Sequence, residues 1–233
     1  MKTNSNSYTI IYSVVLVVIV ALLLAVVFQA LKPRQDVNVA LDQQKQILYS
    51  LNIRGLDDQS AAAKYKEVVV ADQILDENGN VVDEGTQGGT SAGFKLNSAD
   101  YKAGRLALYI CKVDGQTKYV IPVYGMGLWG PINAFVALNE DKATVFGAYF
   151  NHEGETAGLG AEIKDNLKWQ QQFQGKKLFK EGDNSNIALS VVKKVDDPTT
   201  QVDIVTGATL TSNGVTDMFK EGLGKYMKFL NAK

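Results

Sequence analysis

Near its N-terminus the chain carries a long uncharged stretch. From Ile10 to Leu31 it runs for 22 residues without an acidic or basic side chain. About 20 apolar residues in a helix are enough to cross the hydrocarbon core of a bilayer. The pattern therefore predicts a transmembrane helix over residues 10–31, preceded by a short segment over residues 1–9.

A cleaved signal peptide is the alternative interpretation of this stretch. Its apolar region would be only ~7–15 residues long and would end in small residues at an A-x-A-like site. Here the bulky Phe28 stands two residues before Ala30, which favours an uncleaved anchor. Lys2 on one side and Lys32 and Arg34 on the other leave the positive-inside rule almost balanced, so charge alone does not orient the helix.

The pattern of apolar and polar positions changes after the anchor. Apolar residues at helical spacing predict a helix over about Val37–Leu51, and an Ala-rich helical piece follows at Ser60–Lys66. Asn78-Gly79 is a hairpin signal, and the polar stretch Gly85–Gly93 predicts a loop. Strand-like runs occupy Val68–Ala71, Ile74–Leu75, Val81–Val82, Arg105–Val113, Lys118–Tyr124, Ile132–Leu138, Thr144–Phe150, Ile187–Lys194 and Val202–Val205.

Hydrophobic residues near the C-terminus recur at three- and four-residue steps after a break at Gly207. This periodicity predicts an amphipathic helix that starts near Thr209 or Leu210 and packs one face on a core. A shorter helical piece is expected over Asn166–Phe173. Strands grouped together with flanking helices define an α+β fold with an antiparallel sheet. The apolar positions of the last helix are Val215, Met218, Phe219, Leu223, Tyr226 and Leu230, and Lys220, Lys225 and Lys228 fall mostly on its other side.

Composition narrows the classes of function. Residues 32–233 number about 200, and 45% of the chain is hydrophobic, so a domain with an extension can bury a substantial core. The formal net charge of -1 gives no reason to expect a nucleic-acid partner, and no group of His and Cys residues suggests a metal site. The single cysteine, Cys111, excludes an intramolecular disulfide and is expected to be a small apolar residue in a buried strand.

The segment Asp203–Thr209 joins a β-branched run to the start of the last helix. A helix start leaves about four backbone N–H groups unpaired and carries a partial positive charge, so it stabilises a phosphate without any basic side chain. Thr209 lies where such a phosphate would bind. The alternative is structural, because Thr, Ser and Asn at a helix start are more often caps than functional groups.

The same seven residues resemble the Asp-x-x-[Ser/Thr]-Gly-Ala-[Thr/Ser] flavinylation motif of FMN-binding domains, and all five specified positions match. In that family a flavin transferase takes FMN from FAD and joins it to the last hydroxyl through a phosphoester bond. The resemblance implies that Thr209 is a modified residue and not a catalytic nucleophile. It also implies that Gly207 and Ala208 let the transferase and the phosphate approach the backbone, and that the transferase reads Asp203.

Two Gly-rich loops are candidates for the flavin pocket. Gly125–Pro131 contains three glycines around Leu128 and Trp129, and these two side chains could cover the flat, amphipathic isoalloxazine ring. A core or hinge role is the alternative for Trp129. The second loop, His152–Gly160, contains the only histidine of the chain, a residue type that in a polar loop is usually solvated or locally bonded.

Three segments together, Gly127–Trp129, His152–Gly160 and Thr206–Ser212, resemble the flavin-carrying subunits of Na+-translocating NADH:quinone oxidoreductases, which are single-pass membrane flavoproteins. One departure is Ala157, where that family usually has Pro. Equivalent subunits of Rnf-type electron transport complexes carry the same motif and are a second family that the chain resembles. A third possibility is a membrane-anchored, non-redox binding or adaptor domain in which Thr209 is only a cap.

The first resemblance implies that covalent FMN carries electrons between other redox centres of a membrane complex, while the NADH and quinone sites lie in sister subunits. The implied partners are those subunits, the membrane and the FAD-dependent flavin transferase. The implied location is a bacterial inner membrane, with residues 1–9 in the cytoplasm. Residues 32–104 and the FMN-binding domain, residues 105–233, are then expected on the extracytoplasmic side.

The resemblance also implies which residues hold the cofactor. Leu128, Trp129, Thr156 and Leu159 are expected around the ring, and Thr211 with nearby N–H groups at the phosphate. The full set of expected cofactor-binding residues is Thr206, Gly207, Ala208, Thr209, Leu210 and Thr211 at the motif, and Leu128, Trp129, His152, Glu155, Thr156, Gly158 and Leu159 in the two loops.

Overall fold

The computed structural model describes residues 5–232, and the chain forms two compact units, Met1–Gln43 and Gln44–Lys233. Helix α1, Asn6–Ser50, is 45 residues long and runs through nearly all of the described part of the first unit. Its side chains over residues 10–31 are exposed. By length and composition it is able to cross a membrane, with a mean hydropathy of 3.3 over 18 residues.

Helix α1 joins two elements that the sequence predicts separately. The apolar stretch and the helix expected over residues 37–51 form one continuous helix, with Pro33 inside it. Pro33 removes a backbone N–H donor, and the strongly helical segments on both sides continue through that position. Of the N-terminal segment expected over residues 1–9, residues 1–4 lie outside the described residues.

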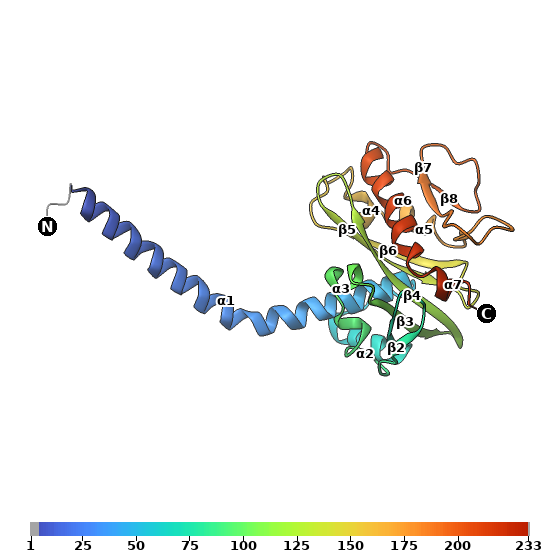
Figure 1. Ribbon diagram of the computed structural model, residues 1–233, viewed down its shortest axis with the longest axis horizontal. Coiled ribbons are helices and arrows are strands. Elements are labelled where there is room, and N and C mark those ends of the chain that lie inside the picture. Colours follow the sequence, from blue (N-terminus) through green and yellow to red (C-terminus); the bar gives the residue numbers. More distant parts are fainter. Residues whose placement is uncertain (1–4, 233) are drawn as a thin grey trace. The chain divides into compact units, whose positions relative to one another are not determined.

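The second unit is built on a six-stranded antiparallel sheet in the order β2-β1-β3-β4-β5-β6 (Figure 1). Its β1–β2 hairpin turns at Asn78-Gly79, as predicted, and the predicted close-spaced strands form the β3–β6 meander. The sequence predicts a division into residues 32–104 and residues 105–233. Since β1 lies before residue 104 and pairs with β3 after it, one sheet contains strands from both parts. The strands are β1 Val69–Leu75, β2 Val81–Asp83, β3 Leu106–Val113, β4 Gln116–Met126, β5 Pro131–Leu138 and β6 Val145–His152.

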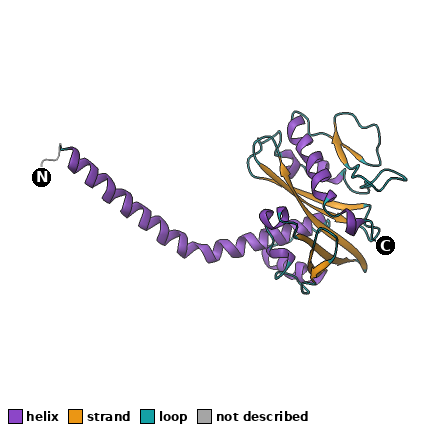
Figure 2. Cartoon of the chain, in the orientation of Figure 1, coloured by secondary structure: helices purple, strands orange, loops and turns teal. Residues whose placement is uncertain are grey.

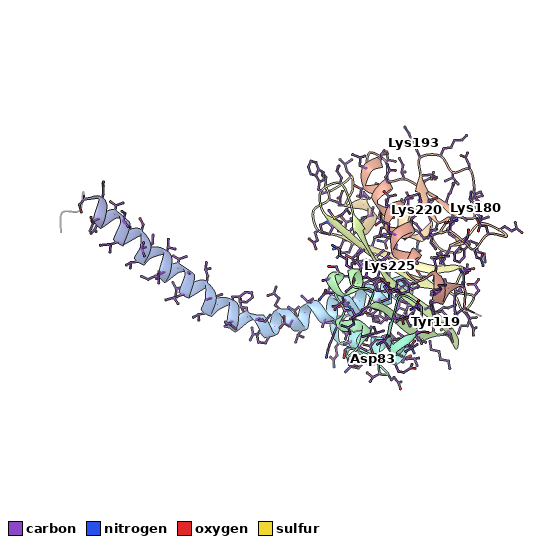
Figure 3. All side chains as sticks on the ribbon, viewed as in Figure 1. Asp83, Tyr119, Lys180, Lys193, Lys220 and Lys225 are labelled. Atoms are coloured by element: carbon purple, nitrogen blue, oxygen red, sulfur yellow. The ribbon has the colours of Figure 1, made fainter. Side chains whose placement is uncertain are left out.

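Helices cover both faces of this sheet, which confirms the α+β class (Figure 2). Helix α6, Thr209–Gly224, packs on β4 and β5 and buries the apolar face that the sequence predicts. Its Lys220 is exposed on the outer side (Figure 3). Phe150 of β6 faces α6 and contacts Phe219. The preceding residue, Tyr149, points to the opposite face of the sheet and contacts Tyr49 at the end of α1.

Helix α2, Asp58–Val68, lies near β1 and β3 and contributes the buried Tyr65. Cys111 in β3 has no exposed surface, and burial raises the pKa of its thiol. A thiol that is both buried and protonated is unreactive. The expected role of Cys111 as an apolar core residue is confirmed.

Several short elements escape prediction because they have too few residues to show a period. The helical piece expected over residues 166–173 is shorter, and the two late strands have three residues each and pair in parallel as a separate two-stranded sheet. The last amphipathic pattern is divided between two helices. The elements that the sequence does not predict are η1 Gly93–Lys95, α3 Ser98–Lys102 and α4 Glu162–Asp165. The shortened or divided ones are α5 Leu167–Gln171, β7 Ser190–Val192, β8 Gln201–Asp203 and α7 Met227–Leu230.

Candidate functional site

The first candidate loop is the tip of the β4–β5 hairpin. Met126 pairs with Pro131, and the Gly127 N–H donates to the Gly130 carbonyl across the tip at 2.8 Å. The loop is therefore shorter than the expected Gly125–Pro131. Trp129 is 68% exposed, which excludes the alternative of a core anchor. A large aromatic side chain that is exposed at the end of a paired hairpin is available to cover a flat ligand.

The second candidate segment begins inside the sheet. His152 is the last residue of β6 and pairs with Ile132, so the expectation of a loop histidine is wrong. Its Nδ1 accepts the backbone N–H of Glu155 at 3.3 Å, which starts a turn. The Thr156 carbonyl then accepts two further N–H groups. This turn presents the side chain of Leu159, which is 43% exposed.

The motif segment turns at Gly207, where φ is +78°, a conformation that L side chains rarely adopt. A Cβ atom there would also come within 2.8 Å of the Leu159 side chain. The glycine of the motif is therefore needed for the turn itself. Helix α6 follows, with Ala208 at the N-cap position and Thr209 as its first residue.

Thr209 does not cap the helix that it begins. Ala208 holds the N-cap position, and no side chain makes a cap hydrogen bond there. The structural interpretation of Thr209 as a cap is thus wrong, and its side chain is exposed. The Ser212 N–H donates to the Ala208 carbonyl, so the N–H groups of the residues before Ser212 lie at the open end of the helix. Such an end favours a phosphate.

The residue that fixes this turn, Ser212, is not among the site residues expected from the sequence. Ser212 is fully buried, and its hydroxyl oxygen accepts the backbone N–H of Val205 at 3.2 Å. The Ala208 N–H donates to the Val205 carbonyl at 3.0 Å. These two bonds close the turn from Val205 to Ala208 onto the first turn of α6, directly beside the exposed Thr209. The sequence feature that could have indicated this role is the position of Ser212, three residues after the last residue of the motif.

Glu155 and Thr211 have partners within the protein. The Glu155 carboxylate accepts the Trp129 backbone N–H through Oε1 at 2.9 Å and the Thr211 hydroxyl through Oε2 at 2.5 Å. Glu155 is 8% exposed and Thr211 is 1% exposed. Hydrogen bonds thus connect the hairpin tip, the turn after β6 and the first turn of α6, which come from distant parts of the sequence.

Exposed apolar side chains surround this junction. Leu210 projects from the first turn of α6 and is 59% exposed, and Met126, which was not expected from the sequence, is 63% exposed at the end of β4. A Cβ on Gly214 of α6 would collide with the Met126 carbonyl, so these two elements are in close contact. Together with Leu128, Trp129 and Leu159, they give the rim of the site an apolar character that a hydrophobic ring would bury.

Asp203 lies on the other side of the motif turn. Its backbone is fixed because its carbonyl accepts the Trp169 indole N–H at 2.8 Å and its N–H donates to Gln172. The side chain is exposed. It lines a cleft of ≈ 490 Å³ that also contains Thr206, Glu162 and Lys168. The acidic group of the motif is thus presented on the surface, apart from the hydrogen-bonded junction at Glu155.

The fold and this site define an FMN-binding domain that follows an apolar helix long enough to span a membrane. The model of the FMN-binding domain family matches residues 127–224, which include the hairpin tip, the turn and the motif. The C subunit of the Na+-translocating NADH-quinone reductase from Haemophilus ducreyi is 35% identical, over 96% of this chain and 94% of the relative. The same subunit from Vibrio anguillarum is 32% identical over 96% and 93%.

A solved structure agrees with the sequence comparisons. The crystal structure of the C subunit of the Na+-translocating NADH-quinone reductase from Parabacteroides distasonis superposes with a TM-score of 0.78 at 34% identity, covering 87% of this chain and 98% of that chain. The chain therefore belongs to the family of Na+-translocating NADH-quinone reductase C subunits. Of the two families that its motifs resemble, this is the one to which it belongs.

Proposed function

We propose that this chain is the FMN-containing electron-transfer subunit of a Na+-translocating NADH-quinone reductase, with its flavin joined covalently to Thr209. One observation carries the proposal. The motif threonine is exposed at the start of the 16-residue helix α6, and no side chain makes a cap hydrogen bond there. A capping residue would have its hydroxyl bonded to the helix. The identity of the cofactor as FMN and the assignment to a reductase complex follow from the family to which the chain belongs.

The residues of the site suit FMN in two parts. The open start of α6 offers N–H groups and a positive dipole to the phosphate on Thr209. The apolar rim offers Leu128, Trp129 and Leu159 to the ring, which would otherwise expose its hydrophobic surface to water. Thr156, Gly158 and His152 shape the turn that carries Leu159. When bound, FMN supplies reversible electron transfer, and the protein positions it and tunes its potential.

The arrangement also suits a subunit that performs no substrate chemistry of its own. Residues 105–233 would hold the cofactor, and residues 32–104 would connect it to the membrane anchor in α1. The substrate sites for NADH and quinone would lie in sister subunits. With the N-terminus in the cytoplasm, the flavin domain would face the extracytoplasmic side of the inner membrane, where covalent attachment prevents loss of the cofactor.

The transferase that attaches FMN is expected to recognise Asp203, because this first residue of the motif has an exposed carboxylate while its backbone is hydrogen-bonded to Trp169 and Gln172. Asp203→Leu should therefore lower the flavinylated fraction several-fold, while the protein still melts cooperatively. Intact mass after co-expression with the transferase measures this fraction. Asp217→Leu, at an exposed position on α6, is the matched control and should be flavinylated fully. Full flavinylation of both variants would remove the recognition role.

Trp129 is expected to cover the ring, so flavin fluorescence should be quenched in the folded protein. Trp129→Ala should restore this fluorescence and leave the covalent bond intact. Its stability cost in apo-protein should be well below the ~3–5 kcal/mol typical of a buried Trp, because the side chain is 68% exposed. Trp169→Ala is the matched comparison, since that indole is 4% exposed and hydrogen-bonded. An unchanged flavin spectrum in Trp129→Ala would place the ring elsewhere.

The non-redox alternative is a membrane-anchored binding or adaptor domain. Purified protein that stays yellow after denaturation would favour the flavoprotein. Protein that carries no covalent flavin, even when it is produced together with the transferase, would favour the adaptor domain.

A further inference from the structure

Glu155 is a buried carboxylate that two separate segments use as a common acceptor. The Trp129 N–H comes from the hairpin tip, 26 residues before Glu155, and the Thr211 hydroxyl comes from α6, 56 residues after it. Each oxygen therefore has one donor from a different element. Hydrogen bonds to an ionised carboxylate are roughly twice as strong as bonds between neutral groups. The carboxylate connects the first turn of the helix that begins at the attachment site with the residue expected to cover the ring.

Two glycines give this carboxylate its space. A Cβ on Gly127 would lie within 3.0 Å of Glu155 Oε1, and a Cβ on Gly160 would lie within 3.0 Å of Glu155 Oε2. Gly160 would also meet the Thr211 hydroxyl at 2.7 Å. Gly127 lies in the loop that the sequence predicts as part of the flavin pocket, and its missing side chain leaves room for the Glu155 carboxylate of the protein itself.

The charge of Glu155 is balanced by dipoles. Among residues 5–232, no ion pair joins Glu155 to a lysine, an arginine or the histidine. Its stabilising groups are the Trp129 N–H, the Thr211 hydroxyl and the positive end of α6. A buried charge without a cation costs free energy unless hydrogen bonds satisfy it. Loss of either donor should therefore weaken the whole junction.

We infer that Glu155 is a positioning residue for the flavin site: its carboxylate fixes Trp129 relative to Thr209, and its negative charge opposes reduction of a flavin held there. The inference rests on the proposed function. Because the Glu155 and Thr211 side chains are hydrogen-bonded to each other, the backbone N–H groups at the start of α6 are the groups that bind the phosphate. The Trp129 ring then has a defined place, because its backbone is bonded to the same residue as the first turn of α6.

The test compares two substitutions in the full-length chain in detergent. Glu155→Gln keeps the volume, one acceptor for Trp129 and, through its amide, a bond to the Thr211 oxygen, but it removes the charge. Glu155→Ala removes charge and bonds together. Glu153→Gln is the matched control, because Glu153 is an exposed carboxylate in the same turn. Flavin fluorescence, the visible circular dichroism of the flavin and its midpoint potential are measured for each variant.

Glu155→Ala should release the flavin fluorescence several-fold and weaken the visible dichroism, and Glu155→Gln should restore both. Glu155→Gln should nevertheless raise the midpoint potential, since a negative charge near the ring is gone. Glu153→Gln should match wild type in every measurement. Wild-type fluorescence and dichroism in a folded Glu155→Ala protein would overturn the positioning role, and an unchanged potential in Glu155→Gln would overturn the charge effect.

A measurement without flavin separates this inference from the proposed function. In a Thr209→Val background, the Trp129 amide should exchange with solvent about tenfold faster when Glu155 is Ala, as expected for loss of a bond worth ~1.4 kcal/mol. Glu155→Gln should retain most of the protection, and Thr211→Val provides an intermediate case if the Ala variant does not fold. Equal exchange rates in these variants overturn the positioning role. Absence of covalent flavin from wild-type protein would instead overturn the proposed function and the charge effect, whereas the exchange rates would still test whether Glu155 fixes the Trp129 backbone.

Discussion

Thr209→Val should produce a folded chain that carries no covalent flavin. Valine has nearly the shape of threonine but lacks the oxygen needed for a phosphoester. The substitution should cost little stability, because the Thr209 side chain is exposed and makes no cap bond at the start of α6. In-gel flavin fluorescence after SDS denaturation and intact mass should both show complete loss, in protein produced together with the flavin transferase.

Thr209→Ser is the control for this experiment. It keeps the hydroxyl and should retain some attachment, whereas Thr209→Val should retain none. Both variants should melt near the wild-type temperature in the absence of flavin. Flavin fluorescence that survives denaturation in Thr209→Val protein would show that another residue carries the cofactor, and the assignment of the motif would fail.

The sequence predicts those parts of the fold that depend on long patterns. The apolar stretch from Ile10 to Leu31, the four close-spaced strands and the face of α6 each span many residues, so their periods are visible without tertiary information. The short helices α3 and α4 have five and four residues and show no period. The parallel pairing of β7 with β8 depends on contacts across the fold and leaves no local pattern.

The candidate site was predictable to a similar extent. The resemblance of the motif to the flavinylation motif identifies Thr209. The structure adds that this residue is exposed and that no side chain makes a cap hydrogen bond at the start of α6. The sequence alone predicts neither the 68% exposure of Trp129 nor the position of His152 at the end of β6. The junction at Glu155 joins residues 26 and 56 positions away. A single sequence gives no indication of such a pairing.

Phe219→Ala should be the most destabilising of the substitutions considered for α6. Phe219 has no exposed surface and lies edge-on to Phe150 of β6 and to Phe173, with ring centroids 5.9 and 5.6 Å away. Removing a buried phenyl group loses its transfer free energy and leaves a cavity, at a typical cost of ~3–5 kcal/mol. Aromatic pairs of this geometry contribute beyond their buried area.

The measurement is urea unfolding of the full-length chain in detergent, followed by circular dichroism. The Phe219→Ala midpoint should fall sharply at an unchanged slope, which indicates lost stability and not a changed unfolded state. Leu210→Ala is the control on the same helix, since Leu210 is 59% exposed and its loss should cost much less. Because Phe219 lies far along α6 from Thr209, any Phe219→Ala protein that folds should still be flavinylated. Equal midpoints for the two variants would mean that α6 does not anchor the flavin site through this cluster.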